Sequence, residues 1–222
     1  NCGTLTLGCS ASERLTRVLR GSEILSLALG TASHFHQGVV ALCMQLTFLG
    51  TGSAMPTGTR FQTGLLVESG DDRLLVDCGS GVLHALQRTP VGYEGVDTVL
   101  LTHHHLDHVS DLLALLKARW LAGAESLTVA GPPGTSTLVR DLLDVHDYLQ
   151  DRVDQAIRDL EEGSFSLAGF DCQAMETRHS MQCFAYRLGH PESDAELTFT
   201  GGTANTETDT FSVPKDGSAS ST

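Results

Sequence analysis

Four histidines and one aspartate occupy six consecutive positions near the middle of the chain, in the stretch Thr102-His103-His104-His105-Leu106-Asp107-His108. Imidazole nitrogen and carboxylate oxygen are ligands that borderline metals such as zinc prefer. The cluster follows a strand pattern and precedes a helical pattern, and such junctions are where α/β folds place their sites. The alternative, a solvated polar loop, gives no reason for so many histidines. The cluster therefore predicts a metal centre.

The patterns on both sides of the cluster predict a mixed α/β sandwich, because strands stand before and after the helices. The expected strands, in chain order, cover residues 45–49, 63–68, 73–77, 98–102, 127–130, 164–170, 172–177 and 183–188. The expected helices cover 82–87, about 110–121 and 136–161, the last with a break near Gln150. The strand at 98–102 leads directly into the histidines and must position them.

Composition divides the chain into three parts. Met44 directly precedes an alternating strand pattern and is a candidate natural start, so residues 1–43 are expected to be an N-terminal extension outside the fold. Residues 44–203 carry the strand and helix patterns and are expected to form the domain. Residues 204–222 are almost entirely small and polar, and we expect them to be a disordered tail.

The charge, hydropathy and cysteine content argue against a nucleic-acid-binding surface, a membrane span and a disulfide framework. With 222 residues, 27 Asp+Glu and 14 Lys+Arg, the chain has a net charge of −13, no basic stripe for nucleic acid and no apolar run of the length of a membrane span. The acidity, with only the lysines Lys117 and Lys215, fits a high-salt cytoplasm, and GC-rich coding is the alternative explanation. The six cysteines form no C-x-x-C pair, which favours a reduced, cytoplasmic chain.

The spacing H-x-H-x-D-H, from His103 to His108, resembles the signature of the metallo-β-lactamase superfamily of metal-dependent hydrolases. Residues 46–53 resemble the opening strand and turn of that family, and residues 75–79 resemble its first motif. Residues 177–187 resemble the third-motif histidine of the ribonuclease Z-like branch and the strand after it. The resemblance covers about residues 44–203 and implies a four-layer αββα sandwich.

The resemblance also implies a set of site residues. In the family, the first two histidines of the cluster and the third-motif histidine hold one metal, and the Asp-His pair helps to hold a second. Carried over to this sequence, the first site consists of His103, His105 and His179, and the second includes Asp107 and His108. The expected metal is Zn²⁺, with manganese and iron as alternatives, since such ligand sets accept all three.

Two further residues are expected to orient the histidine loop rather than to bind metal. Asp77 stands behind the site as an acceptor for the loop, and Thr102 precedes the first histidine. His104 is expected to point the other way along the loop and to be no ligand. The pair His34 and His36 has metal-like spacing but falls in the segment expected to lie outside the fold. His84, His146 and His190 are expected on helix or loop surfaces.

The chemistry of such a site is hydrolysis. Three neutral imidazoles leave an open coordination position, where a bound water is acidified to a pKa of about 7 and becomes a nucleophile. Asp107, beside that water, is expected to take its proton as the catalytic base. The resemblance therefore implies a metal-dependent hydrolase that attacks a phosphodiester or a related ester, either ribonuclease Z-like or arylsulfatase-like.

The sequence departs from the family pattern at its C-terminal end. Gly202 stands where the family supplies a bridging aspartate, and no histidine follows His190. We therefore expect one tight metal site, a weak second site, and an incomplete second half of the sandwich. The composition break after Thr203 suggests a C-terminally truncated family member. An inactive chain that binds one metal or none is the alternative to an enzyme.

The substrate is a small ester or a nucleic-acid phosphodiester, and the sequence does not choose between them. Residues 55–61 lack the Lys-x-Arg-Asn that tRNA 3′-end processing enzymes show after the same proline, and Ser80 stands where those enzymes usually carry glutamate. A general phosphodiesterase is thus an equal candidate. The resemblance leaves a homodimer open, and no membrane partner is expected.

Overall fold

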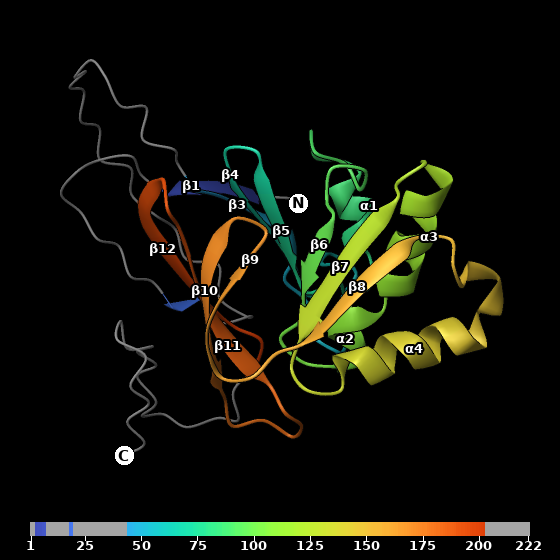
Figure 1. Cartoon of the computed structure of the whole chain (residues 1–222). Coiled ribbons are helices and arrows are strands. Elements are labelled where there is room, and N and C mark those ends of the chain that lie inside the picture. The colour runs from blue at the N-terminus through green and yellow to red at the C-terminus, as the bar shows by residue number, and fades with distance from the viewer. Residues whose placement is uncertain (1–2, 8–17, 20–43, 203–222) are drawn as a thin grey trace.

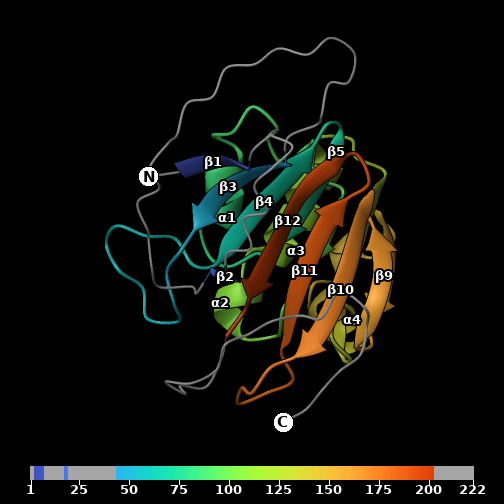
Figure 2. The same ribbon diagram turned by 90° about the vertical axis from the view of Figure 1, so that its left-hand side faces the viewer.

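The computed structural model describes residues 3–7, 18–19 and 44–202. Two sheets pack face to face, and helices cover the outer face of the first sheet (Figure 1). The view turned by 90° shows the outer face of the second sheet, which no helix of the described residues covers (Figure 2). The mixed α/β sandwich predicted from the sequence is present, with helices on the first sheet and none of the described helices on the second.

The first sheet has seven strands in the order β1-β3-β4-β5-β6-β7-β8. Their bounds are Gly3–Leu7 (β1), Met44–Gly50 (β3), Gly64–Ser69 (β4), Asp72–Val76 (β5), Thr98–Leu100 (β6), Ser126–Gly131 (β7) and Asp154–Asp159 (β8). The strands from β1 to β5 pair antiparallel, and those from β5 to β8 pair parallel. The carboxyl ends of β5 and β6 therefore meet at one edge of the sheet, where the loops to the next helices begin.

The second sheet has five strands in the order β2-β12-β11-β10-β9. Their bounds are Val18–Leu19 (β2), Gly163–Leu167 (β9), Phe170–Glu176 (β10), Phe184–His190 (β11) and Ser193–Thr200 (β12). The strands from β9 to β12 form an antiparallel meander, and β2 pairs parallel with β12. The turn between β10 and β11 and the end of β12 lie at the same end of this sheet.

Alternation along the strands builds two separate cores. In β5, Leu75 packs into the core beneath the helices, whereas Leu74 and Val76 pack into the core between the sheets. The same alternation in β4 sends Leu66 toward the helices and Leu65 toward the second sheet. Since successive side chains of a strand point to opposite faces, the near-continuous apolar runs of β4 and β5 are those of strands buried on both sides.

In the described residues, four α-helices lie between consecutive strands of the first sheet: α1 (Val82–Leu86), α2 (Leu106–Val109), α3 (Leu112–Leu121) and α4 (Thr135–Val145). The first turn of α1 is held by Asp111, whose Oδ2 accepts hydrogen bonds from the backbone N–H of Gly81 at 2.9 Å and of Leu83 at 3.0 Å. The backbone N–H of Cys78 in turn donates to the carbonyl of His108 at 2.7 Å. The loops after β5 and β6 are therefore bound to each other.

Two element predictions need correction. The stretch 136–161 is not one helical region, because α4 ends at Val145, a 3₁₀ turn covers Asp147–Leu149 and the chain then forms β8. Strand β8 pairs parallel with β7, and its alternating half-buried positions, Gln155 and Ile157, carry the period of a strand. Pairing with the free edge of β7 stabilises this segment as a strand more than its helical propensity stabilises a helix. Helix α2 was also missed, so Asp107 and His108 are helical rather than part of a loop.

Two bonds join the sheets beside the end of β6. The backbone N–H of Phe184, at the start of β11, donates to the carbonyl of Thr102 at 2.9 Å, and the hydroxyl of Tyr186 donates to the carbonyl of Leu101 at 2.8 Å. Tyr186 is fully buried, and burial raises the pKa of its phenol well above the usual value. The second sheet thus holds the strand end that leads into the histidine cluster.

Several sequence predictions fall outside the described residues or stay untested. Residues 3–7 and 18–19 pair with the sheets, whereas the other residues of 1–43 and residues 204–222 lie outside the described part, so the domain limits at 44 and 203 stay predictions. Cys78, Cys172 and Cys183, the cysteines within the description, are free thiols. In this same part of the chain, we find no helix with both the length and the apolar character needed to span a membrane.

The Tyr186 hydroxyl gives a stability prediction. Tyr186→Phe leaves the buried carbonyl of Leu101 without this donor, so we expect the free energy of unfolding to fall by about 1–2 kcal/mol, measured by urea denaturation. Tyr148→Phe is the matched control, because Tyr148 is 47% exposed and should change the free energy by under about 0.5 kcal/mol. Equal unfolding midpoints for wild type and Tyr186→Phe would contradict the prediction.

Candidate metal centre

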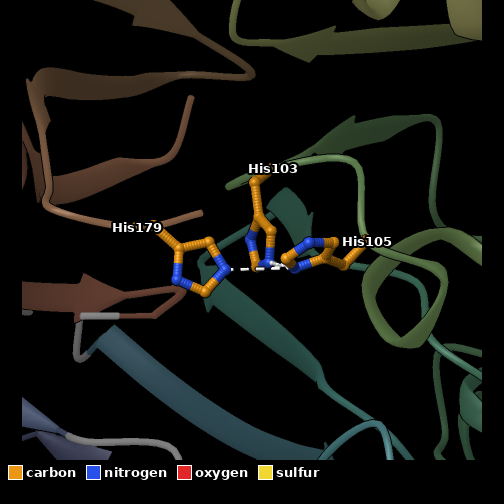
Figure 3. Close-up of side chains that lie close together, drawn as sticks. All are labelled: His103, His105 and His179. Atoms are coloured by element: carbon orange, nitrogen blue, oxygen red, sulfur yellow. Dashed lines mark hydrogen bonds between the residues drawn. The ribbon is translucent and has the colours of Figure 1, made fainter. Parts of the chain in front are cut away.

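Three histidines from two distant segments converge at the end of the sandwich (Figure 3). His103 and His105 come from the loop after β6, and His179 comes from the turn between β10 and β11. One ring nitrogen of each lies within 4.8 Å of the other two. The Nε2 atoms of His103 and His179 each lie 3.0 Å from Nδ1 of His105. The three histidines that the sequence predicts as the first site are therefore brought together.

The arrangement of these nitrogens fits a metal ion. A neutral imidazole nitrogen offers either one lone pair or one N–H, so Nδ1 of His105 cannot form good hydrogen bonds with two nitrogens at once. Tetrahedral zinc with Zn–N bonds of about 2.0–2.1 Å requires its ligand nitrogens to be roughly 3.3 Å apart. Two of the three spacings, at 3.0 Å, lie close to that value, and the third lies within 4.8 Å. A cation between the three nitrogens would use all three lone pairs.

The buried carboxylate of Asp77 sets the ring orientation of His103 through Thr102. The Thr102 hydroxyl donates to Asp77, 3.0 Å from Oδ1 and 2.9 Å from Oδ2, and Nδ1 of His103 lies 3.0 Å from that hydroxyl oxygen. Because the hydroxyl proton points at the carboxylate, the oxygen accepts from Nδ1–H of His103. The proton on Nδ1 leaves the lone pair of Nε2 directed at the centre of the three histidines.

The same carboxylate orients His108. Oδ2 of Asp77 lies 2.6 Å from Nδ1 of His108, and Oδ1 of Asp77 accepts a hydrogen bond from the backbone N–H of Thr102 at 2.8 Å. Asp77 has a φ of 60°, in the left-handed region that aspartate tolerates better than most residues. These contacts place Asp77 and Thr102 behind the histidine loop, where the sequence predicts them.

Burial and neighbouring groups shift the pKa values of these histidines in different directions. Burial, followed by the nearby His108, His179 and His105, lowers the pKa of His103 to about 2. Burial and then His105 also lower the pKa of His179. For His108, burial acts to lower the pKa, but the Asp77 carboxylate outweighs it and raises the pKa. The rings of His103 and His179 are thus neutral near pH 7, and the neutral ring is the form that binds metal.

Asp107 and His108 lie next to this group without joining it. Asp107 is 9% exposed, and its Oδ2 lies 3.5 Å from Nε2 of His108. The rings of His103 and His108 are 4.0 Å apart between centroids. The predicted second site therefore offers one carboxylate and one imidazole beside the three histidines.

Gly202 lies directly against the third histidine. A Cβ built on Gly202 would meet the His179 ring at 3.0 Å from Cε1 and 3.2 Å from Nδ1. The Gly202 carbonyl accepts the Thr177 hydroxyl at 3.0 Å, which fixes the end of β12 beside the turn that carries His179. The position where the sequence pattern expects a bridging aspartate is therefore at the centre, and it supplies no side chain.

The remaining histidines have other partners. Nε2 of His104 lies 2.8 Å from the Thr135 hydroxyl, so His104 points toward α4 and away from the other three, as expected. His84 and His146 are exposed. The expectation that His190 lies at the surface is wrong, because it is 7% exposed and its Nε2 lies 3.0 Å from Asp72. His34 and His36 fall outside the described residues.

Two residues near the centre were missed from the sequence. The hydroxyl of Ser180 lies 3.4 Å from Nε2 of His105, so it is placed to accept the proton of the nitrogen that faces away from the centre. Asp111 holds the loop after β5, as described above. Ser180 adjoins His179 in sequence and was a visible candidate, whereas nothing in the sequence links Asp111 to a loop 30 residues earlier.

Comparison with known proteins decides the family. A family model described as "Anti-Pycsar protein Apyc1" matches residues 44–213. The chain belongs to the Anti-Pycsar protein Apyc1 family. It is also a ribonuclease Z-like member of the metallo-β-lactamase superfamily, with the fold of that superfamily.

Individual relatives of this Apyc1-family chain include ribonucleases Z. Ribonuclease Z of Methanopyrus kandleri is 35% identical over 147 residues, which cover 66% of this chain and 50% of that protein. The metallo-β-lactamase fold protein YhfI from Bacillus subtilis has a TM-score of 0.62 and 26% identity over 74% of this chain and 64% of its own. The short form of human tRNase Z has a TM-score of 0.57 and 22% identity, covering 70% and 68%. The chain spans half or less of the length of the curated relatives it matches.

The metal content of the chain tests the three-histidine site. We expect about one metal per chain by elemental analysis of protein purified in high salt, and close to none in His103→Ala or His179→Ala, since each loses one of three ligands. His146→Ala removes an exposed histidine and should keep the wild-type content. Retention of metal by both ligand variants would contradict the assignment.

The affinity for zinc tests the role of Asp77. Asp77→Asn keeps the shape of the side chain and tolerates the same φ, but it removes the carboxylate charge that strengthens the hydrogen bonds from Thr102 and His108. We therefore expect the affinity for zinc to fall about 10–100-fold in a competition titration. Asp141→Asn makes the same chemical change on an exposed position of α4 and should leave the affinity unchanged. An unaltered dissociation constant in Asp77→Asn would show that Asp77 does not orient the ligands.

Proposed function

We propose that this chain is a metal-dependent hydrolase that attacks a phosphodiester or a related ester. The single observation that carries the proposal is the convergence of His103, His105 and His179, each with one nitrogen facing a common centre. A bound Zn²⁺ would supply Lewis acidity and a water that ionises near neutral pH. Manganese and iron suit the same ligands. The donor set, rather than the fold alone, supports the hydrolytic chemistry.

The residues of the chain have separate roles in this proposal. The three histidines bind the metal, and Asp77 and Thr102 keep the Nε2 lone pair of His103 directed at it. Asp107, nearly buried beside the centre, holds the proton that the attacking water releases. His108 and Asp107 contribute to a weaker second metal position, since Gly202 adds no carboxylate there.

The substrate follows from the relatives and from charge. The relatives named ribonuclease Z support a phosphodiester as the bond that is cleaved. The net charge of −13 disfavours long nucleic acids, because a polyanion meets repulsion over its whole length. We therefore propose a small phosphate ester or a short nucleic-acid phosphodiester as the substrate, in the cytoplasm, with the chain acting alone or as a homodimer.

Two other observations bear on function. The absence of a side chain at Gly202, in contact with His179, favours the alternative of a chain that binds one metal without turnover. The family match favours an anti-Pycsar role, as the family name states, and a hydrolase centre is the chemical means by which we propose that such a role is exerted.

Turnover tests the enzyme against the inactive alternative. We expect hydrolysis of bis-p-nitrophenyl phosphate with added zinc or manganese, abolished in His103→Ala. Gly202→Asp should raise the rate on the order of tenfold, which corresponds to about 1.4 kcal/mol of extra stabilisation of developing charge by a second cation, and should raise the metal content from about one toward two. The His179 ring must move by a few tenths of an ångström to admit the new side chain.

A matched control separates the position from the added charge. Gly189→Asp places a carboxylate at the far end of β11, where a Cβ makes only ordinary contacts, and should change neither rate nor metal content. No turnover in wild type and in Gly202→Asp would refute the hydrolase and support the inactive alternative. Equal effects of the two glycine variants would show that Gly202 does not occupy the bridging position.

A further inference from the structure

His104 lies in sequence between two of the three histidines of the metal centre and has a hydrogen-bond partner of its own. Its Nε2 lies 2.8 Å from the hydroxyl oxygen of Thr135, the first residue of α4. That hydroxyl donates to the carbonyl of Pro132 at 2.8 Å, so the hydroxyl oxygen accepts a hydrogen bond from Nε2–H of His104. The histidine loop after β6 is therefore bound to the loop after β7 through a side chain that points away from the centre.

The acceptor of this bond is held firmly at the start of α4. Thr135 is fully buried, and its backbone N–H donates to the same Pro132 carbonyl at 3.1 Å. The backbone N–H of Ser136 donates to Asp159 of β8 at 2.9 Å, which binds the first turn of α4 to the first sheet. Pro132 and Pro133 have fixed φ angles, so this loop has few alternative conformations.

His105 has weaker support for its own ring than His103 has. The buried pair Asp77 and Thr102 orients the ring of His103. The outer nitrogen of His105 instead faces the exposed Ser180 hydroxyl at 3.4 Å, which is long for a hydrogen bond. The direction of the His105 ring therefore depends more on the backbone that carries it.

The backbone that carries these rings is extended. His105 has a φ of −63° and a ψ of 147°, and successive side chains of an extended segment point to opposite sides. A bond that holds the ring of His104 on the side of α4 thus directs His103 and His105 to the other side, where the three histidines meet.

We propose that His104 is a positioning residue, whose hydrogen bond to Thr135 holds the loop in the conformation that directs His103 and His105 at the metal. This inference rests on the metal centre of the proposed function and not on its hydrolysis. Without the bond, the loop also adopts conformations in which the ligands are misplaced, and the apparent affinity for metal falls with the fraction of chains that stay competent.

The affinity of the full chain for zinc, measured by competition titration, tests this role. His104→Leu removes the donor and Thr135→Val removes the acceptor at nearly constant volume, so we expect each to weaken zinc binding about tenfold. His104→Gln places an N–H where Nε2 of the histidine stands, and it should restore most of the affinity. The double variant His104→Leu/Thr135→Val should lose no more than either single variant, because both changes remove the same bond.

His84→Leu is the matched control, since His84 is exposed on α1, where its Nε2 lies 2.9 Å from Arg88, and this variant should keep the wild-type dissociation constant. Circular dichroism identifies the variants that fold, and Thr135→Val carries the test if His104→Leu does not fold.

An unchanged affinity in His104→Leu or Thr135→Val, equal losses in His104→Leu and His104→Gln, or additive losses in the double variant would each overturn the inference. A wild type that binds no zinc would overturn it together with the metal centre. The expected order of affinities without any ester turnover would retain the inference and refute the proposed hydrolase.

Discussion

The buried carboxylate of Asp77 is the constraint on which the metal centre depends. It is fully buried in a left-handed backbone conformation, and a buried carboxylate without partners would be strongly unfavourable. Its partners are the backbone and hydroxyl of Thr102 and the ring of His108. One charge therefore fixes the conformation of the loop after β5, the direction of the loop after β6 and the tautomer of two rings. Relaxation of any of these groups would leave that charge with fewer hydrogen bonds.

The sandwich supplies what this local network cannot, namely the third histidine. His179 is about 75 residues away from the cluster and belongs to the other sheet, so its position depends on how the sheets pack. The bonds from Phe184 to Thr102 and from Tyr186 to Leu101 fix the sheets together just before the histidine loop. The apolar core between the sheets provides the free energy of packing, and these two polar bonds select the register at the site.

Local patterns in the sequence predicted much of this arrangement. The histidine cluster and most strands of both sheets follow from residue type and periodicity, whereas the place of Asp77 behind the site came from resemblance to a family. Strand β8 was missed because its sequence also suits a helix, and only the free edge of β7 decides between them. Asp111 and Ser180 were missed because their roles arise from contacts between segments. The choice of His179 came from resemblance to a family, since periodicity says nothing about which distant histidine completes a site.

A divalent cation at the centre would be surrounded by a chain with a net charge of −13. Three imidazoles bring no negative charge to a divalent cation, and Gly202 brings none where a carboxylate would balance it. Asp107, which lies 3.5 Å from His108, and the buried Asp77, which contacts His108 on its other nitrogen, lie next to the cluster, so a bound dication would meet less negative charge than it would with a carboxylate at position 202. At 0.15 M salt, the electrostatic fields of a bound cation and of the acidic surface each decay over about 8 Å. A small anionic ester is attracted by a cation at the centre and lies mostly beyond the reach of the acidic surface, whereas a long polyanion is also repelled by that surface. The lack of a bridging carboxylate therefore strengthens the attraction for a small anionic substrate and weakens the binding of a second metal.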